Sequence, residues 1–574
     1  MKKKPPATPS VTPDTPIDPQ RRRLLGGMAA AGAVLALGGN ETALAGSHRD
    51  ADASAGATDG ELDALLSRHI HNVVVIYAEN RSFNNLFANF PGVEKPLAAL
   101  KPADYQQRDR DGTLLEQLPP IWGGLVPHPQ EVNHRTWKIH KDDLTGLPNQ
   151  PWALRAPNGD PLPHGVVTGD LWHVFYQNQL QINGGKNDGF VAWGNTGAQV
   201  MGYYADTHVN LRLWQIAQRY TLCDNFFMGA FGSSFLNHQY LVAAQPPFYP
   251  QADQSPARYG IAKLEGDDPK GIRLKQTEDS PASAMQGHAK FSPNSLTPDF
   301  WAVNTIGPAY APGFNTDPKN PQLADASSPN TLPPQQHKTI GDVLSAKGID
   351  WAWYAGAWQL ALQGRGDGDE GEDGKPGKPY PPTPNFQPHH QPFNYFQQFA
   401  PGTVARQQHL RDAGVGDNAP GNRLLVDIAA GKLPAVTYYK PQGDLNMHAG
   451  YSDVEAGDRH IAHVLDALQK SPQWKHMLVV VTFDENGGWW DHVAPPKGDR
   501  WGPGSRIPAL VVSPFAKKGH VDHTIYDTGS IARFITRRFG LEKLPGLALR
   551  EQSMRDAGGQ APGDLTAALH FERS

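Results

Sequence analysis

Cysteine is almost absent from this chain of 574 residues, which contains only Cys223. A single cysteine excludes an intrachain disulfide and a zinc site built from several thiolates. The segment around it, YTLCDNFF, is apolar and predicts a buried, unreactive thiol.

A strong excess of one charge sign is absent as well, because the formal net charge is only -5. Composition therefore gives no general reason to expect nucleic-acid binding.

Long hydrophobic runs are also lacking. The apolar stretch at residues 24–39 is short for a membrane span and rich in Gly and Ala. Arginines at 21–23 precede it, and the small residues ALA at 43–45 follow it. Residues 1–45 therefore predict a twin-arginine-type signal peptide, export by the twin-arginine machinery, and a periplasmic or secreted location. We expect no transmembrane segment in the mature chain.

Apolar segments typical of strands alternate with helical patterns along most of the chain. The expected strands lie at 72–78, 221–228, 350–356, 434–440, 477–483 and 507–515. The expected helices lie at 339–348, 453–471 and 527–540. Such alternation is typical of βαβ units around a parallel sheet. The sequence therefore predicts an α/β fold, a three-layer α/β/α sandwich with a mostly parallel central sheet.

Long polar stretches separate these elements, at about 93–165, 245–335 and 362–425. The chain contains 59 glycines and 52 prolines, and these turn-rich stretches predict long loop insertions. Residues 364–385 are acidic and then proline-rich, which favours a solvated flexible loop. A calcium loop is the alternative, but the liganding glutamate of an EF-hand is missing.

Two of the expected strands end in side chains that could bind a metal ion. Glu79 and Asn80 follow the strand at 72–78, and Asp484 and Glu485 follow the strand at 477–483. Ligands bind at the carboxyl ends of strands in open parallel sheets, and oxygen donors suit a hard or borderline cation. The same pattern also fits two unrelated strand ends with exposed acids. The first interpretation predicts one divalent metal ion.

A candidate nucleophile lies in MGAFGSSFLNHQYLVAAQ, where glycines 229 and 232 permit a tight turn before an apparent helix. Ser233 or Ser234 then opens that helix, whose free N–H groups favour an anion such as phosphate. A serine in this place is also a common helix cap.

Histidine is frequent, with 23 residues, and four of them lie beside aromatic residues and outside helical patterns. Several histidines that converge on a phosphate would supply hydrogen-bond donors and a general acid. Each one alone also fits a structural or surface role. The four candidates are His173, His389, His390 and His448.

The motifs AENRSFNNLF, NGGKNDGF, MGYY, GSSFLNH and TFDENGGWWDHV together resemble the bacterial phospholipase C/acid phosphatase (phosphoesterase) family of the alkaline phosphatase superfamily. The resemblance runs from about residue 70 to 540. It implies an α/β/α core, a bound metal and a phosphorylated Ser or Thr. Its metal ligands fall on Glu79, Asn80, Asp484 and Glu485, and its nucleophile falls on Ser234 rather than Ser233.

The resemblance also implies an organisation for the whole chain. We expect a signal peptide at 1–45, a linker at 46–69, a phosphoesterase catalytic domain with long insertions at 70–545, and a C-terminal tail at 546–574. The nucleophile turn lacks the Pro of the family's phospholipase branch and carries His in place of its Arg. This turn and the segment HHQPFNYF resemble the acid phosphatase branch.

The mechanism that the resemblance implies begins with attack of Ser234 on phosphorus. The metal, His173 and Lys186 are expected to meet the phosphoryl oxygens. One of the other candidate histidines is expected to protonate the leaving oxygen. Lys186 and Asn237 are the candidate substrate-binding residues.

The expected function is therefore an exported metal-dependent acid phosphatase that hydrolyses small phosphomonoesters through a phosphoserine intermediate. The close alternative is a phospholipase C that cleaves phosphodiester lipids, with phospholipid as its substrate. A non-catalytic periplasmic binding protein is an alternative of a different class, although simple capture needs no activated serine beside a metal.

Overall fold

A central sheet of eight strands organises the protein, whose computed structural model describes residues 58–363 and 384–571. All of its strands run parallel except β16, which is antiparallel to both neighbours. The mostly parallel sheet predicted from the sequence is confirmed. In spatial order the strands are β13 (Leu410–Gly414), β12 (Trp351–Gly356), β14 (Val436–Lys440), β1 (Asn72–Ala78), β15 (Met477–Phe483), β16 (Ala509–Val512), β6 (Thr221–Cys223) and β17 (His520–Asp522).

The three central strands β14, β1 and β15 end at one edge of the sheet. Ala78 at the end of β1 lies beside Phe483 at the end of β15, and β14 ends at Lys440, one step earlier in register. Every residue of these strands is buried, which accounts for their continuous apolar sequences. The polar residues that end or follow these strands therefore emerge side by side.

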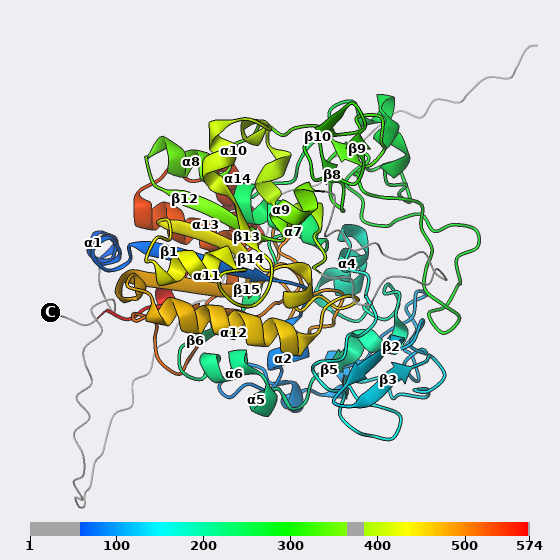
Figure 1. Ribbon diagram of the computed structural model, residues 1–574. Helices are drawn as coiled ribbons and strands as arrows, with labels where there is room; N and C mark the ends of the chain where they lie inside the picture. Colours follow the sequence, from blue (N-terminus) through cyan, green and yellow to red (C-terminus); the bar gives the residue numbers. More distant parts are fainter. Residues whose placement is uncertain (1–57, 364–383, 572–574) are drawn as a thin grey trace, which may run out of the picture. The chain divides into compact units, whose positions relative to one another are not determined.

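One group of helices covers the front face of the sheet. The amphipathic helix α12 (Val454–Lys470) packs on α11 (Arg423–Ala429) and on α6 (Arg212–Ala217). Asp453 caps the start of α12 by accepting a hydrogen bond from the N–H of Ala456. Figure 1 shows α11 and α12 in front of the strands.

A second group of helices covers the opposite face. Helix α13 (Gly529–Phe539) packs on α1 (Asp59–His69) and on α7 (Ser234–Ala243), and α7 also contacts α8 (Ile340–Ala346). With helices on both faces, the predicted three-layer α/β/α architecture is confirmed.

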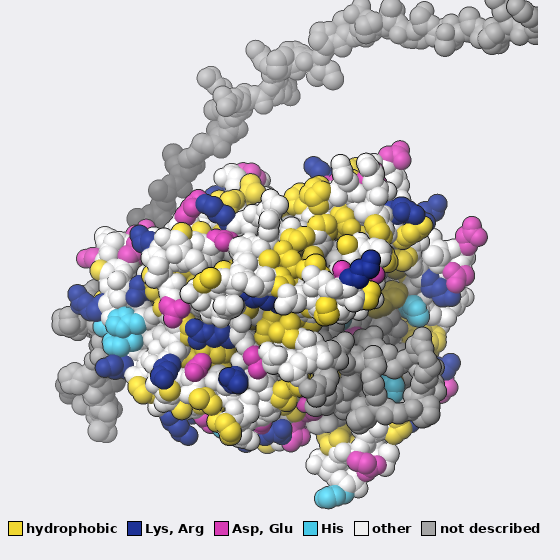
Figure 2. All heavy atoms as spheres, turned by 45° about the horizontal axis from the view of Figure 1, so that its top comes forward, with side chains coloured by type: hydrophobic (Ala, Val, Ile, Leu, Met, Phe, Trp, Pro, Cys, Tyr) yellow, Lys and Arg dark blue, Asp and Glu magenta, His cyan; other side chains and the backbone are white. Residues whose placement is uncertain are grey.

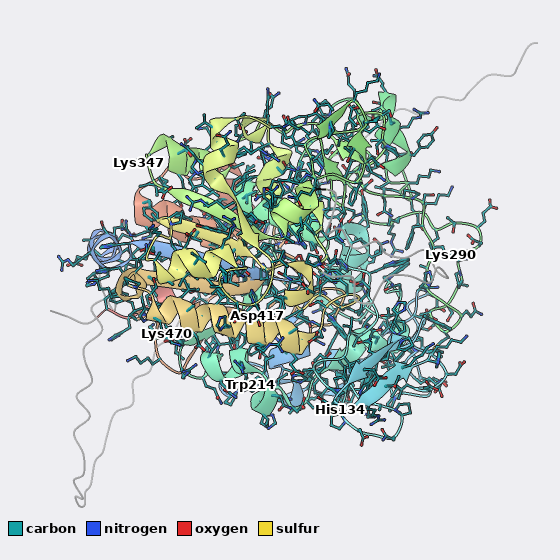
Figure 3. All side chains as sticks on the ribbon, in the orientation of Figure 1. His134, Trp214, Lys290, Lys347, Asp417 and Lys470 are labelled. Atoms are coloured by element: carbon teal, nitrogen blue, oxygen red, sulfur yellow. The ribbon has the colours of Figure 1, made fainter. Side chains whose placement is uncertain are left out.

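Helices α8 and α12 end on the side of the sheet where the parallel strands begin. Lys470 ends α12 and Lys347 follows α8, and both lie on the left of the view in Figure 3. In Figure 1 the strand β1 starts on that same side and runs to the right. Helices that run opposite to parallel strands bring their N-termini toward the carboxyl ends of the strands.

The remaining α-helices and strands lie outside the central sheet and the helices named above. The remaining helices are α2 (Phe83–Phe87), α3 (Pro102–Tyr105), α4 (Phe175–Ile182), α5 (Thr207–Asn210), α9 (Trp358–Leu362), α10 (Val404–His409) and α14 (Pro545–Asp556). The remaining strands are β2 (Val126–Val132), β3 (Arg135–Ile139), β4 (Trp152–Ala153), β5 (Gly202–Tyr203), β7 (Phe226–Phe227), β8 (Gly307–Pro308), β9 (Thr316–Asp317), β10 (Asn320–Ala324), β11 (Thr331–Leu332) and β18 (Tyr526–Asp527). On the face shown in Figure 2, basic and acidic side chains are interspersed.

The expected strand at 221–228 is in fact two strands, β6 and β7. The chain turns between them at the buried Asp224, whose carboxylate accepts hydrogen bonds from the N–H of Glu94 and from His523. The polar stretch at 362–425 contains α10 and the edge strand β13. Short strands with polar positions carry no clear alternation, so the sequence pattern did not indicate β13.

Both ends of the described chain are structured. Helix α1 begins inside the expected linker, where Thr58 and Glu61 form a capping box. Helix α14 lies in the expected C-terminal tail and buries Leu547 and Arg550. The expected signal peptide and residues 364–383 lie outside the described residues. Within the described ranges, no helix is long and apolar enough to cross a membrane.

Candidate active site

The acids that follow β1 and β15 lie together at the carboxyl edge of the sheet. Glu79, Asn80, Asp484 and Glu485 are all fully or almost fully buried, so the alternative of exposed acids at strand ends is wrong. The N–H of Asn80 donates to Asp484 Oδ1 at 3.2 Å, which joins the two strand ends directly. Asn80 has φ 62°, a left-handed conformation that asparagine adopts more readily than most residues.

The turn before α7 presents Ser234 to this cluster. The Ser234 hydroxyl lies 2.6 Å from Glu485 Oε1 and 3.2 Å from Asn80 Oδ1. Gly232 has φ 48°, and a Cβ at this position would lie 2.3 Å from the carbonyl carbon of Val174. Only glycine fits such a close approach. The Ser233 hydroxyl is buried without a hydrogen-bond partner in the described part of the chain.

Asn237 holds this turn and has no polar atom left for a substrate. Its side-chain oxygen accepts a hydrogen bond from the N–H of Ala230 at 2.9 Å. Its amide group donates to the carbonyl oxygens of Gly232 at 2.9 Å and of Ala230 at 3.2 Å. The expectation that Asn237 binds substrate is therefore not supported, because its amide is fully used inside the turn.

His173 lies against the same carboxylate as the serine. Its Nδ1 is 2.8 Å from Glu485 Oε1, and its Nε2 is 3.5 Å from Asp170 Oδ1. Burial alone would lower the pKa of His173, but the negative charges of Glu485 and Asp170 hold it well above its usual value. The raised pKa makes His173 a cation. Its side chain is 19% exposed and lies at the open side of the cluster.

Glu79 is the centre of a buried group that joins it by ion pairs and one hydrogen bond. Lys440 Nζ and His390 Nε2 each lie 2.6 Å from Glu79 Oε1, and the Tyr451 hydroxyl donates to Glu79 Oε2 at 2.7 Å. Burial alone would raise the pKa of Glu79, but Lys440 and His390 hold it well below its usual value. Glu79 is therefore an ionised carboxylate in a dry environment.

Asp484 and Glu485 keep free acceptor atoms. Asp484 Oδ2 and Glu485 Oε2 are buried without a hydrogen-bond partner among the described residues. Burial, together with the charges of Glu79 and Glu485, raises the pKa of Asp484 well above its usual value. Ligand atoms of Glu79, Asp484 and His238 lie within 4.8 Å of one another. Orphaned carboxylate oxygens and a nearby imidazole fit a bound divalent cation.

The other candidate histidines surround the cluster. His389 and His390 form a short 3-10 helix, Pro388–His390, and the ring centroid of His389 is 5.1 Å from that of His238. The ring centroid of His448 is 5.2 Å from that of His173. Burial lowers the pKa of His389, His390 and His448 below the usual value. The four predicted histidines are therefore brought together around the carboxylates.

Lys186 is the predicted residue that the structure does not bring to the cluster. It follows α4 after a short 3-10 helix and its side chain is exposed. No ion pair or hydrogen bond of its side chain reaches Ser234 or the acids in the described ranges. A lysine in a glycine-rich turn is free to face solvent, and nothing in the packing turns it inward.

Comparison with known proteins agrees with this arrangement. A sequence model of the Phosphoesterase family matches residues 70–542. The chain belongs to the phosphoesterase family. The family resemblance predicted from the motifs is confirmed.

Several phospholipases C share parts of this phosphoesterase sequence. The chain is 31% identical to a non-hemolytic phospholipase C of Pseudomonas aeruginosa over 177 residues, which cover 25% of this chain and 24% of that protein. It is 34% identical to the non-specific phospholipase C6 of Arabidopsis thaliana over 147 residues, 20% of this chain and 28% of that protein. A solved structure of a protein in the alkaline phosphatase superfamily from Vibrio parahaemolyticus has 12% identity and a TM-score of 0.28, and covers 69% of this chain and 67% of that chain.

Four residues of the candidate site were not predicted. Lys440 is a polar residue at the end of the apolar strand β14, and the ends of β1 and β15 show the same pattern. His238 lies four residues after Ser234 on α7, a spacing that places both on one helix face. Tyr451 and Asp170 lie outside regular elements, where the sequence offers no periodic signal.

Proposed function

We propose that this protein hydrolyses phosphoric esters with Ser234 as its nucleophile. The observation that carries the proposal is the 2.6 Å contact between the Ser234 hydroxyl and Glu485 Oε1, beside the two further buried carboxylates of Glu79 and Asp484. Membership of the phosphoesterase family supports the same reaction class. An activated serine of this kind forms a covalent phosphoserine that water then hydrolyses.

The candidate metal ligands are Glu79, Asn80, Asp484 and Glu485, with His238 added by the structure. These residues would hold a divalent cation, whose positive charge would lower the pKa of a nearby hydroxyl and polarise a phosphoryl oxygen. Buried carboxylates repel one another in a dry site unless a cation or protons compensate them. Lys440 balances Glu79 and the protonated His173 balances Glu485, whereas Asp484 has no lysine or arginine partner among the described residues.

The remaining steps use groups of this chain. Ser234 passes its proton to Glu485 Oε1, which lies 2.6 Å away, and its oxygen bonds to phosphorus as the bond to the ester oxygen breaks. The protonated His173, at the open side of the site, faces the negative charge that develops on the phosphoryl oxygens. His389, His390 or His448 donates a proton to the leaving oxygen.

The proposed substrates are phosphomonoesters, as for an acid phosphatase. A monoester carries two non-bridging charges and favours a site with several hydrogen-bond donors, and the clustered histidines supply such a site. The second candidate is phospholipase C activity on phosphodiester lipids, which the names of the similar proteins favour. Both candidates share the nucleophile and differ in the room required beside the phosphate.

Two substrates with the same leaving group separate these candidates. We expect p-nitrophenyl phosphate to show the higher kcat/KM and p-nitrophenyl phosphorylcholine the lower in mildly acidic buffer, because burial lowers the pKa of the three histidines proposed as the acid. A preference for the phosphorylcholine diester would replace the phosphatase with the phospholipase. Absence of hydrolysis of both substrates by the metal-loaded protein would refute the proposed function.

Export by the twin-arginine route remains part of the proposal, with residues 1–45 as the signal peptide and the periplasm or the medium as the location. Its support is the arginine run at 21–23 before a weakly apolar stretch. Replacement of Arg22 and Arg23 by lysine should hold the precursor in the cytoplasm on cell fractionation. Unchanged export of the double variant would indicate the ordinary secretory route.

A further inference from the structure

The nucleophile turn is anchored by a helix that lies beyond the family match. The family model ends at residue 542, and α14 (Pro545–Asp556) follows it. Helix α14 begins in direct backbone contact with the end of α7. A Cβ at Gly546 would lie 1.9 Å from the carbonyl oxygen of Ala244, the residue that caps α7. The helix that carries Ser234 is therefore supported at its far end by α14.

Arg550 of α14 contacts the turn that precedes the start of α7. Its side chain is 3% exposed, and one of its terminal nitrogens donates to the carbonyl oxygen of Gly229 at 2.8 Å. The guanidinium also donates to Asp499 Oδ2 at 2.7 Å and to Asp527 Oδ2 at 3.1 Å. Planar guanidinium groups hold several acceptors in fixed directions, which a lysine cannot do.

Asp499 extends this contact to a second point of the turn. Its Oδ1 accepts a hydrogen bond from the N–H of Trp501 at 2.8 Å. The carbonyl oxygen of Trp501 accepts a hydrogen bond from the N–H of Phe231 at 2.7 Å. Arg550 therefore holds the backbone at Gly229 directly and at Phe231 through Asp499, just before Ser234.

We propose that Arg550 is a positioning residue for Ser234, which sets the direction of its hydroxyl by fixing the backbone of residues 229–231. The inference rests on the proposed function, because it concerns the same nucleophile. A shift of about 1 Å in a reacting group can lower the rate about 100-fold. Loss of the Arg550 guanidinium should therefore reduce turnover although no atom of Arg550 touches the cluster of acids in the described structure.

Arg533 provides a matched control. It is 5% exposed and donates to the other oxygen of the same aspartate, Asp527 Oδ1, at 2.7 Å. Its second acidic partner is Glu551, at 3.0 Å. None of its hydrogen bonds in the described ranges reaches the turn at 229–234. Arg550→Ala and Arg533→Ala thus each remove a buried guanidinium from Asp527, and only the first releases the turn.

The test compares kcat and KM of the two variants with those of the full-length, metal-loaded enzyme on p-nitrophenyl phosphate. Arg550→Ala should lower kcat about 10- to 100-fold while KM changes less than about threefold, because a misdirected nucleophile affects the chemical step. Guanidinium chloride at about 10 mM should restore part of kcat by filling the vacated site, and urea at the same concentration should not. Arg533→Ala should keep wild-type kcat and show no rescue.

Hydrogen exchange supplies a readout that does not depend on activity. Amides of residues 229–234 should exchange faster in Arg550→Ala and at the wild-type rate in Arg533→Ala. If the wild-type enzyme hydrolysed no ester, the proposed function would fail and this exchange alone would decide the positioning role. The positioning role of Arg550 would be overturned if Arg550→Ala showed unchanged exchange, wild-type kcat or no rescue by guanidinium. If Arg550→Ala failed to fold, Arg550→Lys would replace it and should show the same loss of kcat.

Discussion

The hydroxyl of Ser234 and the carboxylate of Glu485 lie 2.6 Å apart although 251 positions separate them in the chain. The same Glu485 oxygen is 2.8 Å from His173 Nδ1, so one carboxylate joins the proposed nucleophile to an imidazole. Ser234 opens α7, and Glu485 follows β15. The contact therefore depends on the helix start and the strand end meeting at one edge of the sheet.

Replacement of Ser234 by alanine should abolish turnover, whereas Ser233→Ala should leave it nearly intact. Only the Ser234 hydroxyl contacts Glu485 and Asn80, while the Ser233 hydroxyl has no partner in the described structure. Loss of a nucleophile typically costs about three orders of magnitude in kcat or more. Steady-state rates on p-nitrophenyl phosphate measure the difference.

Mass spectrometry of protein quenched during turnover gives an independent check on the nucleophile. The phosphate should be found on the peptide that contains Ser234 and should be absent from the Ser234→Ala variant. An active Ser234→Ala enzyme with an inactive Ser233→Ala enzyme would mean that the nucleophile is one residue earlier in the turn.

Asp484→Asn should release the metal and lower kcat by at least about 100-fold. The substitution keeps an acceptor for the N–H of Asn80 but removes one of three buried carboxylates. Without metal, the variant should be more stable than the metal-free wild type, because buried like charges repel one another. Elemental analysis and urea unfolding of the same samples measure both effects.

Asp444→Asn is the control for this metal experiment. Asp444 follows β14 on the same side of the sheet, but its carboxylate accepts its hydrogen bond from Gln442 rather than from a member of the cluster. The metal content and kcat of Asp444→Asn should equal those of the wild type. Full metal occupancy in Asp484→Asn would remove Asp484 from the ligand set.

Asn237→Asp should lower kcat about 10- to 100-fold with a smaller change in KM. An aspartate retains the acceptor for the N–H of Ala230 but cannot donate to the carbonyl oxygens of Gly232 and Ala230. The turn should then lose its fixed geometry. Val242→Ala, a buried change on the same helix, should lower stability without this change in kcat. Equal kinetic effects of both substitutions would make Asn237 a purely structural residue.

The carboxyl edge of the sheet could be predicted from the sequence because β1 and β15 are buried on both faces. Such strands have continuous apolar runs, and the first polar residue after each run marks where it leaves the core. Glu79 and Asp484 were therefore found without any knowledge of the register between the strands. Lys440 ends a similar run in β14, and the same argument would have identified it.

The contacts made by individual side chains could not be predicted in the same way. Asn237 has the chemistry of a phosphate donor, and only the structure shows that its amide is used inside the turn. His389 and His390 lie on a short 3-10 helix in a long insertion, where no period relates sequence position to direction. Lys186 belongs to a conspicuous motif and is exposed. Residue type indicates which chemistry is possible, and packing decides which atoms remain free.

His337 should make the protein less stable as the pH falls below neutrality. Burial lowers its pKa to about 4, and its ring packs edge-on against Phe396 with centroids 5.0 Å apart. The unfolded chain has a histidine pKa of about 6.5, so it binds a proton that the folded protein excludes. The contribution of neutral His337 to the free energy of unfolding is therefore complete above about pH 6.5 and is lost as the pH falls toward 4. Between pH 7.5 and 5 the loss should be about 2 kcal/mol.

His337→Leu should remove this part of the pH dependence, because leucine is neutral at every pH and can still pack against Phe396. Urea unfolding at pH 7.5 and pH 5 should show a difference in the free energy of unfolding that is smaller than in the wild type by about 2 kcal/mol. The exposed His140→Leu is the control and should leave the wild-type difference unchanged. A wild-type difference in His337→Leu would show that the half-buried ring of His337 does not resist protonation, and that other groups cause the loss of stability in acid.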